Sequence, residues 1–511
     1  MALFETTLIL LLIAIALLQS SRRLAIPYPT MLAMAGVAVA ALPWTPAIGI
    51  DPHLSMALFI APALLDAAFD FPPLALRRHW IPLVALAALA VVFTTLVVAW
   101  AGVVWGGMPL AAAIALGAIV SPPDAAAATA MLRRFSLPRS TVTVLLGESL
   151  LNDAIALLIY GAAVGRTAGD AQPHELVLQL ALAAPGGVLL GIVLARISSS
   201  LSRHMFGTMG HIVFGFVVTW TVWIIADRLH LSPILAVVAF GMTIARRVPS
   251  VTPARDRVNA YAVWEVAVFV LNVLAFLLVG LQARTIVGGL DRQQLQHALA
   301  FAGVVFALVV FVRVGWVMVY NLLMRPVYRR MKRSPPTRAQ GTVVAWCGMR
   351  GLVTLATALA LPDQFPARGL IVLSALGVVL GTLVLQGLTL GPLIRRLNFP
   401  PDDSFDTELT QARLAMLDAA VEALDGSTTD TAQAMRKTYA EKRGRVAAGS
   451  YPADDETLGL RRQVIAAQRS KIDALRLQGT IDDDVFHALE EELDRAELAV
   501  SPQERLELLE S

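Results

Sequence analysis

The sequence predicts an all-α polytopic membrane protein of about 13 transmembrane helices, followed by a helical tail. The 511 residues are 57% hydrophobic and 15% charged, and their mean hydropathy is +0.66. Such a chain is too apolar for a soluble protein of two or three domains. Its apolar residues form blocks of about 20, which is the helix length that crosses roughly 30 Å of hydrocarbon. The strands of a membrane β-barrel would be shorter, and apolar and polar residues would alternate along them.

The charge divides the chain into two predicted domains. Residues 1–400 carry 28 Lys and Arg against 14 Asp and Glu, whereas residues 401–511 carry 13 against 24. We therefore expect a membrane domain at 1–400, in contact with lipid, and an acidic cytosolic tail at 401–511. Because the basic residues flank apolar blocks, they indicate membrane orientation and not a nucleic-acid partner.

Thirteen candidate spans follow from the breaks between apolar blocks. They cover residues 2–20, 25–46, 54–71, 80–105, 110–132, 140–165, 175–197, 206–227, 231–246, 259–283, 295–324, 339–361 and 367–394. With the N-terminus outside, the cytoplasmic loops hold 21 basic residues and the opposite loops hold 5, as the positive-inside rule requires. Arg22 and Arg23 follow the first block, the reverse of the charge order in a cleaved signal peptide, so we expect a retained span.

The chain has a single cysteine, Cys347, which excludes an intramolecular disulfide and argues against a thiolate metal site. We interpret it as a small packing residue.

Acidic residues within apolar spans are the strongest functional signal, because an ionised carboxylate at bilayer depth costs several kcal/mol unless it has a partner or a cavity. The six candidates are Asp66, Asp70, Asp124, Glu148, Asp153 and Glu265. Asp70 and Glu265 lie near a cytoplasmic boundary, where an interfacial carboxylate is the simpler interpretation. We assign them no role in transport.

Asp153 lies in a run with three other polar residues. Ser149 and Asp153 are four residues apart and share a helix face, and Glu148 and Asn152 share the adjacent strip. A polar seam that joins helices is the alternative. Four polar groups within six residues exceed what a seam requires, so we favour a binding site.

Two irregularities predict broken helices. Pro122 and Pro123 remove two backbone donors inside the fifth span, where Asp124 could cap a half-helix or assist binding of a cation to the freed carbonyl oxygens. In the twelfth span, Gly348 and Gly351 flank Arg350. A simple kink at the prolines is the alternative. Because each break is fifth in its half of the chain, we predict an inverted-repeat fold with two broken crossing helices.

Two arginines, Arg313 and Arg350, lie within spans and need partners, because a guanidinium group keeps its proton. Asp66 and Glu148 are the candidates. Spacing does not decide which acid pairs with which arginine.

These residues carry a resemblance to a known family. The runs Gly147–Ala154, Ala61–Ala68, Phe276–Leu281 and Gly348–Gly351 resemble motifs of the bacterial sodium/proton antiporters, in the NhaP-like branch that includes the animal sodium/proton exchangers. The resemblance covers about residues 55–396. It implies an antiporter of the inner membrane, a secondary transporter and not an enzyme, with a cytoplasmic C-terminal tail and a homodimeric assembly.

The resemblance also implies roles for single residues. Asp153 would be the exchanged site, with Ser149, Asp124 and the carbonyl of Pro123 completing the shell of the cation, and Asn152 would support the site without binding a proton. It pairs Glu148 with Arg313, and Asp66 with Arg350.

The chain departs from the family at one place. Where the family has Thr-Asp-Pro, this chain has Pro123-Asp124-Ala125, so a threonine hydroxyl cannot serve as a ligand. The preference among Na⁺, Li⁺ and K⁺ is therefore open.

Exchange follows if proton and cation compete for one buried carboxyl that faces each side alternately. One titrating Asp beside a neutral Asn predicts electroneutral one-for-one exchange, with no cofactor and no nucleotide. A non-transporting sensor of ion or pH is the alternative, but the tail has no kinase, cyclase or nucleotide motif. An intramembrane enzyme is a third, but no metal-ligand spacing or nucleophile elbow accompanies the acids. The tail is either a regulatory or dimer contact or a passive solvated segment.

Overall fold

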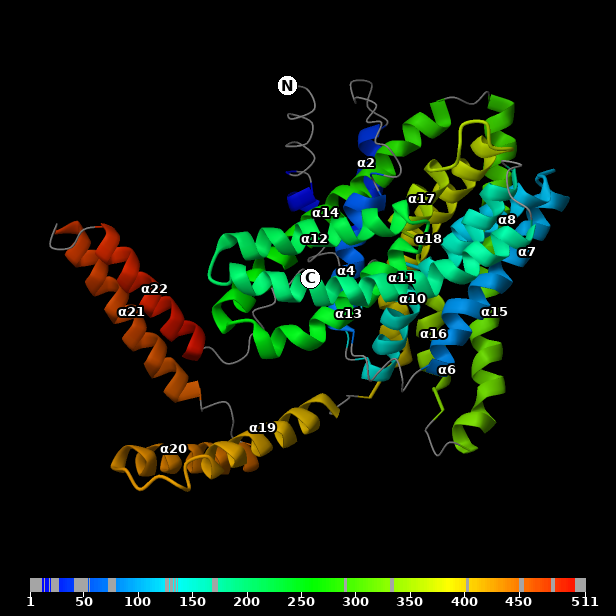
Figure 1. Cartoon of the computed structure of the whole chain (residues 1–511). Helices are drawn as coiled ribbons and strands as arrows, with labels where there is room; N and C mark the ends of the chain where they lie inside the picture. The colour runs from blue at the N-terminus through cyan, green and yellow to red at the C-terminus, as the bar shows by residue number, and fades with distance from the viewer. Residues whose placement is uncertain are drawn as a thin grey trace. The chain divides into compact units, whose positions relative to one another are not determined.

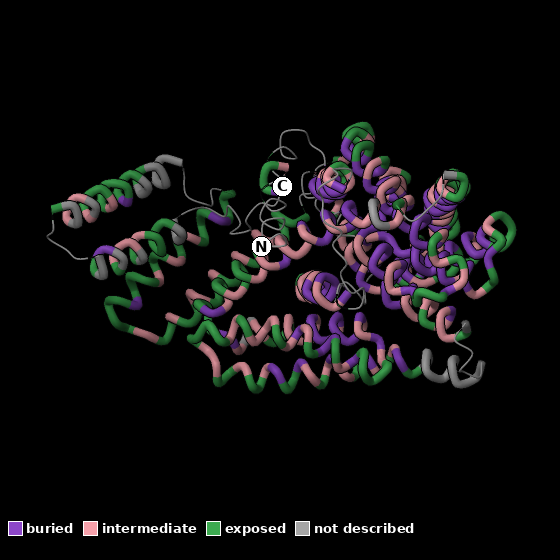
Figure 2. The backbone as a smooth tube through the Cα atoms, turned by 90° about the horizontal axis from the view of Figure 1, so that it is seen from above, coloured by how far each residue is buried: buried purple, intermediate pink, exposed green. Residues whose placement is uncertain are grey.

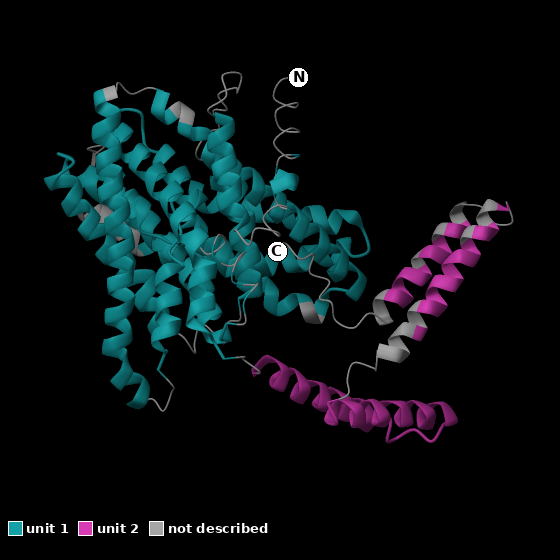
Figure 3. Ribbon diagram, turned by 180° about the vertical axis from the view of Figure 1, so that it is seen from behind, with its two compact units in different colours: residues 1–401, 510–511 teal, residues 402–509 magenta. Residues whose placement is uncertain are grey.

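The computed structural model describes residues 14–17, 27–40, 56–71, 80–124, 137–167, 173–288, 292–330, 335–400, 404–449, 455–478 and 483–500, with a few single positions before residue 137. Every regular element in these ranges is a helix (Figure 1). The chain forms two compact units, residues 1–401 with 510–511, and residues 402–509 (Figure 3).

Seven helices in the described part of the chain are long and apolar enough to cross a membrane. They cover Trp80–Val104, Arg139–Arg166, Leu182–Met205, Met209–Arg228, Ala254–Gly288, Gln293–Arg330 and Arg368–Leu397. Shorter apolar helices are α2 (Tyr28–Ala40) and α8 (Leu110–Val120). The predicted all-α membrane fold is confirmed. The count of thirteen stays a prediction, since the first span, 2–20, lies largely outside the described residues.

The remaining elements of the first unit follow the predicted spans. They are η1 (Met56–Ile60), α4 (Ala61–Asp70), α6 (Trp80–Leu83), η2 (Val84–Leu89), α7 (Ala90–Val104), α10 (Arg139–Thr167), α11 (Pro173–Ser202), η3 (Arg203–Met205), α12 (Met209–Arg228), α13 (Pro233–Val251), α14 (Ala254–Gly288), α15 (Arg292–Arg330), α16 (Arg338–Trp346), α17 (Leu352–Leu359) and α18 (Arg368–Leu397).

Helix packing in this unit is close where small residues meet. A Cβ atom at Gly36 of α2 would overlap the backbone of α14 at Leu277 and Gly280, so these two helices cross with their backbones in contact. Elsewhere α8 packs against α7, α10, α17 and α18. Buried residues of α7, α8 and α18 form one apolar cluster, and Figure 2 shows buried residues concentrated inside the larger helical bundle.

Both predicted interruptions are present. The helix α8 ends at Val120 and is followed by a non-helical stretch through Asp124. The helices α16 and α17 are separated by non-helical residues 347–351. The two Pro residues and the glycines at these points explain why neither helix continues.

The regular elements in the described residues of the second unit are helices. The helices α19 (Ser404–Glu422) and α20 (Asp430–Ala447) pack as one pair, and α21 (Asp455–Leu477) and α22 (Asp483–Val500) pack as another. Each pair is an antiparallel hairpin (Figure 1).

Candidate functional site

The non-helical stretch 121–124 after α8 contacts the non-helical stretch 347–351 between α16 and α17, and we call this place the crossing. The backbone N–H of Asp124 donates a hydrogen bond of 2.7 Å to the carbonyl oxygen of Met349. A Cβ atom at Gly351 would overlap the carboxylate of Asp124. Because Gly351 is the N-cap residue of α17, the Asp124 carboxylate lies at the positive end of that half-helix. A residue of one predicted repeat therefore lies at the start of a helix of the other.

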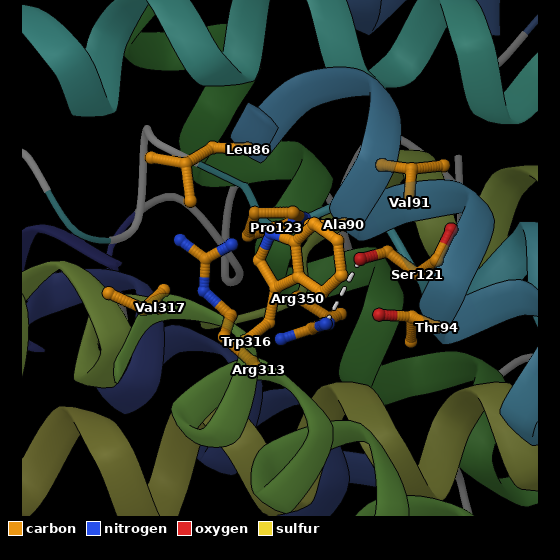
Figure 4. A pocket seen from close by; sticks show the side chains of 10 residues that line it. All are labelled: Leu86, Ala90, Val91, Thr94, Ser121, Pro123, Arg313, Trp316, Val317 and Arg350. Carbon is orange, nitrogen blue, oxygen red and sulfur yellow. Dashed lines mark hydrogen bonds between the residues drawn. The ribbon is translucent and has the colours of Figure 1, made fainter. Parts of the chain in front are cut away.

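Arg350 holds the opposite end of the crossing. Its guanidinium group is 1% exposed, and it donates through Nε to the carbonyl oxygen of Val120 and through one terminal nitrogen to that of Ser121, both at 3.0 Å. The other terminal nitrogen donates to the carbonyl oxygen of Gly348. Figure 4 shows the bond to Ser121. Val120 and Ser121 have carbonyl groups left unpaired by the end of α8, so Arg350 caps that helix.

These partners of Arg350 differ from Asp66, the partner that the resemblance implied. The three guanidinium nitrogens of Arg350 donate to backbone carbonyl oxygens and not to the carboxylate of Asp66. Asp66 lies half-buried on α4. Its pairing with Arg350 stays a prediction.

Glu148 and Arg313 are brought together as the resemblance implied. Both terminal nitrogens of Arg313 donate to the Glu148 carboxylate, one of them at 3.0 Å, and that nitrogen also donates to the carbonyl oxygen of Val344 at 3.1 Å. The two side chains are 1% and 5% exposed. Glu148 is thus neutralised by a bidentate ion pair.

Asp153 differs from Glu148 in this respect. Its side chain is 6% exposed on α10, and among the described residues its carboxylate forms no ion pair. Asp124 comes from the break beside it, because the carbonyl oxygen of Pro123, the residue before Asp124, accepts a hydrogen bond from Asn152, the residue before Asp153. Two like charges in a buried place favour occupation by a proton or a cation.

Asn152 connects α10 to the break in α8. Its side chain is fully buried, and its Nδ2 donates a hydrogen bond of 3.0 Å to the carbonyl oxygen of Pro123. Its Oδ1 has no hydrogen-bond partner among the described residues. The carbonyl of Pro123, an expected cation ligand, therefore already accepts one donor and keeps its second lone pair.

Two small cavities border this site, each with room of about 10 Å³ for the centre of a water-sized sphere. Pro123 and Arg313 line both of them. One cavity also has Glu148, Ser149 and Cys347 in its wall. The other lies beside Arg350 and is lined by Leu86, Ala90, Val91, Thr94, Ser121, Pro123, Arg313, Trp316, Val317 and Arg350 (Figure 4). Each space suffices for about one water molecule.

The two acids without an assigned role lie apart from the crossing in sequence. Asp70 is exposed at the last position of α4, and Glu265 is half-buried on α14. Cys347 is buried in the break between α16 and α17, as a packing residue would be.

Sequence reasoning missed the residues that fix the backbone of the crossing. Thr382 of α18 is fully buried, and its Oγ1 accepts a hydrogen bond of 3.0 Å from the backbone N–H of Arg350. The Pro-Pro break did predict freed carbonyl oxygens, and a buried arginine is a suitable donor for them. That pairing of signals could have identified the capping role of Arg350.

A family model described as "Sodium/hydrogen exchanger, transmembrane" matches residues 8–396, most of the chain. The chain belongs to the sodium/hydrogen exchanger family. An uncharacterised Na⁺/H⁺ exchanger of Mycobacterium tuberculosis is 30% identical over 503 residues, covering 92% of this chain and 91% of that protein. A sodium, potassium, lithium and rubidium/H⁺ antiporter of Bacillus pumilus is 29% identical, covering 93% and 74%.

The fold is also found among solved structures. The sodium proton antiporter MjNhaP1 of Methanocaldococcus jannaschii matches with a TM-score of 0.61 and 16% identity, over 75% of this chain and 98% of that one. The predicted antiporter fold is thereby confirmed for this exchanger.

Proposed function

We propose that this exchanger moves a monovalent cation, Na⁺ as its principal substrate, in exchange for a proton by competition of the two ions for Asp153. The observation that supports this most is the contrast between two buried acids on α10. Glu148 is neutralised by Arg313, whereas Asp153 interacts with a second carboxylate at the crossing. Asp153 is thus the acid that needs a mobile positive charge.

The cation's oxygen ligands lie around the crossing. The charge of Asp124 acts on Asp153. Ser149 lies one turn before Asp153 on α10. The carbonyl oxygen of Pro123 is joined to α10 by its hydrogen bond from Asn152. Carboxylate, hydroxyl and carbonyl oxygens are the ligands of hard cations. In this proposal Asn152 positions the carbonyl and binds no proton.

The family membership supports Na⁺ as a substrate, and the names of the relatives include further monovalent cations. One curated relative, 30% identical over 71% of this chain, is named a low-affinity Na⁺/H⁺ antiporter, from Synechocystis. The Bacillus pumilus relative is named for four cations. Li⁺ and K⁺ use the same oxygen ligands as Na⁺, so they are further substrates to measure.

Asp153→Asn tests the proposal, because it keeps the size of the side chain and removes the charge that both ions need. We expect cation-driven dequenching of a pH-sensitive dye in proteoliposomes to fall to the level of empty vesicles. Asp70→Asn, at an exposed position outside the site, is the matched control and should transport normally. Wild-type rates in Asp153→Asn would overturn the assignment.

A single titrating carboxyl beside a neutral amide gives an exchange of one cation for one proton. Such a cycle moves no net charge, so its rate should not change when a membrane potential is imposed on the vesicles. A rate that rises with the potential would rule out the one-for-one stoichiometry.

A further inference from the structure

The second hairpin of the tail, α21 with α22, has a closed core on one side. Ile465 of α21 and Phe486 of α22 are buried, at 7% and 6% exposure. Arg469 of α21 donates to the carboxylates of Asp494 and Glu497 of α22, which ties the two helices together. These contacts define the direction in which each helix faces its neighbour.

A second, apolar face of the same hairpin is exposed. Leu460 and Val464 of α21 are each 58% exposed, and Val485 of α22 is 48% exposed. Ala467 and Ala488, three residues after Val464 and Val485, are exposed as well and extend the two stripes. We call these five residues the tail stripe.

The two halves of the tail stripe point to the same side. Val464 precedes the buried Ile465 by one residue, and Val485 precedes the buried Phe486 by one, so each is turned about 100° from the core contact. Because α21 and α22 run antiparallel, this equal turn brings both residues to one face of the hairpin. A hairpin with such an exposed apolar face has the shape of one half of a four-helix bundle.

The charges of the two helices select the partner. The helix α21 has five basic and three acidic residues, whereas α22 has one basic and seven acidic residues. We propose that the tail stripe binds the tail stripe of a second copy of this chain, with α21 of each copy against α22 of the other. The opposite arrangement would place the two strongly acidic α22 helices side by side, where they repel.

This arrangement has a two-fold axis parallel to the helices, and it fixes which residues meet. Val464 lies thirteen residues before the end of α21, and Ala496 lies thirteen residues after the start of α22. Because a short loop joins these two helix ends, both residues lie at the same height along the hairpin. The two-fold axis keeps this height in the partner copy, so Val464 of one copy faces Ala496 of the other. Ala496 is exposed and continues the stripe of α22. The exposed Lys471, six residues before the end of α21, and the exposed Glu492, nine residues after the start of α22, lie within one turn of each other along the helices and would pair across the interface.

Disulfide cross-linking in the full-length protein tests this interface. The background is Cys347→Ala, which removes the only cysteine. One tagged copy carries Val464→Cys, and a co-expressed copy with a different tag carries Ala496→Cys. Mild oxidation of the membranes should give a covalent dimer that contains both tags, and only contacts between copies can produce it.

Two controls make the result specific. Val464→Cys paired with Met416→Cys, an exposed position on α19, reports random collisions. Val464→Cys on both copies reports the like-to-like arrangement, in which α21 meets α21. We expect little mixed-tag dimer from either control, and Leu460→Lys should reduce the Val464–Ala496 product to the collision level.

A Val464–Ala496 yield no higher than the Met416 control would overturn the proposal, as would an equal yield from Val464 on both copies. Because the readout is a covalent dimer and not transport, it stands or falls independently of the proposed exchange at Asp153.

Discussion

At the scale of single residues, the two buried arginines of the membrane unit are stabilised in different ways. Arg313 meets a carboxylate, so its charge is cancelled by an opposite charge. Arg350 meets carbonyl oxygens, so its charge is stabilised by backbone dipoles at the end of α8. The second solution needs a planar group with donors in several directions, which only arginine provides.

Arg350→Lys should therefore be a damaging substitution, although it keeps the charge. An ammonium group at the end of a flexible chain cannot reach the carbonyl oxygens of Val120 and Ser121 in the same geometry. Losing two charge-assisted hydrogen bonds should destabilise the protein by roughly 2–4 kcal/mol. The measurement is thermal unfolding in detergent together with transport in proteoliposomes.

Arg368→Lys provides the comparison for that experiment. Arg368 also donates to carbonyl oxygens at a helix end, those of Leu361 and Leu359, but its side chain is 32% exposed. Water can replace its bonds, so we expect a smaller loss. Equal effects of the two substitutions would contradict a capping role specific to Arg350.

At the scale of elements, the crossing joins two half-helices with opposite ends. The carboxyl end of α8 carries partial negative charge and receives Arg350, and the amino end of α17 carries partial positive charge and receives Asp124. Each charged residue comes from the other broken helix. The two breaks therefore stabilise one another, and neither would be stable alone at membrane depth.

Gly351→Ala tests this dependence at its closest point. A methyl group at Gly351 would overlap the carboxylate of Asp124 and push it away from the start of α17. We expect transport to decrease, with the apparent affinity for the cation weakened by about ten-fold, a loss of ~1.4 kcal/mol. Cation titrations in proteoliposomes measure the change.

Gly303→Ala in α15 is the matched control, since nothing lies within 4 Å of a Cβ atom at that position. It should bind the cation like the wild type. If Gly351→Ala also did so, the carboxylate of Asp124 would not be needed at the end of α17.

The sequence reveals the two helix breaks more directly than it reveals the partners of the buried side chains. The breaks at Pro122–Pro123 and Gly348–Gly351 follow from backbone chemistry, so their positions could be predicted from the residues alone. The Pro-Pro break also signals freed carbonyl oxygens that a buried arginine can cap, but the sequence does not tell which carbonyl oxygens accept from Arg350 and which one accepts from Asn152. Spacing also left the partners of the arginines open, and the family resemblance supplied the Glu148–Arg313 pair that the structure contains.

At the scale of the whole molecule, the proposed exchange depends on one site that serves both ions in turn. The buried charges of the crossing are otherwise matched: Glu148 with Arg313, Arg350 with the end of α8, and Asp124 with the start of α17. In the proposed mechanism, Asp153 is the acid for which the transported ion supplies the match. Proton and cation then exclude each other at one carboxyl, and this has a consequence for the dependence of transport on pH.

The apparent KM for Na⁺ should rise as the pH falls, because a protonated Asp153 cannot bind the cation. In the range where the carboxyl is mostly protonated, we expect a rise of about ten-fold per pH unit. The maximal rate at saturating Na⁺ should change much less, since enough cation displaces the proton. Initial rates in proteoliposomes at equal pH on both sides, over a Na⁺ series at each pH, measure both quantities. A maximal rate that collapses at low pH while KM stays constant would show that the proton acts at a separate regulatory group, and competition at Asp153 would then be wrong.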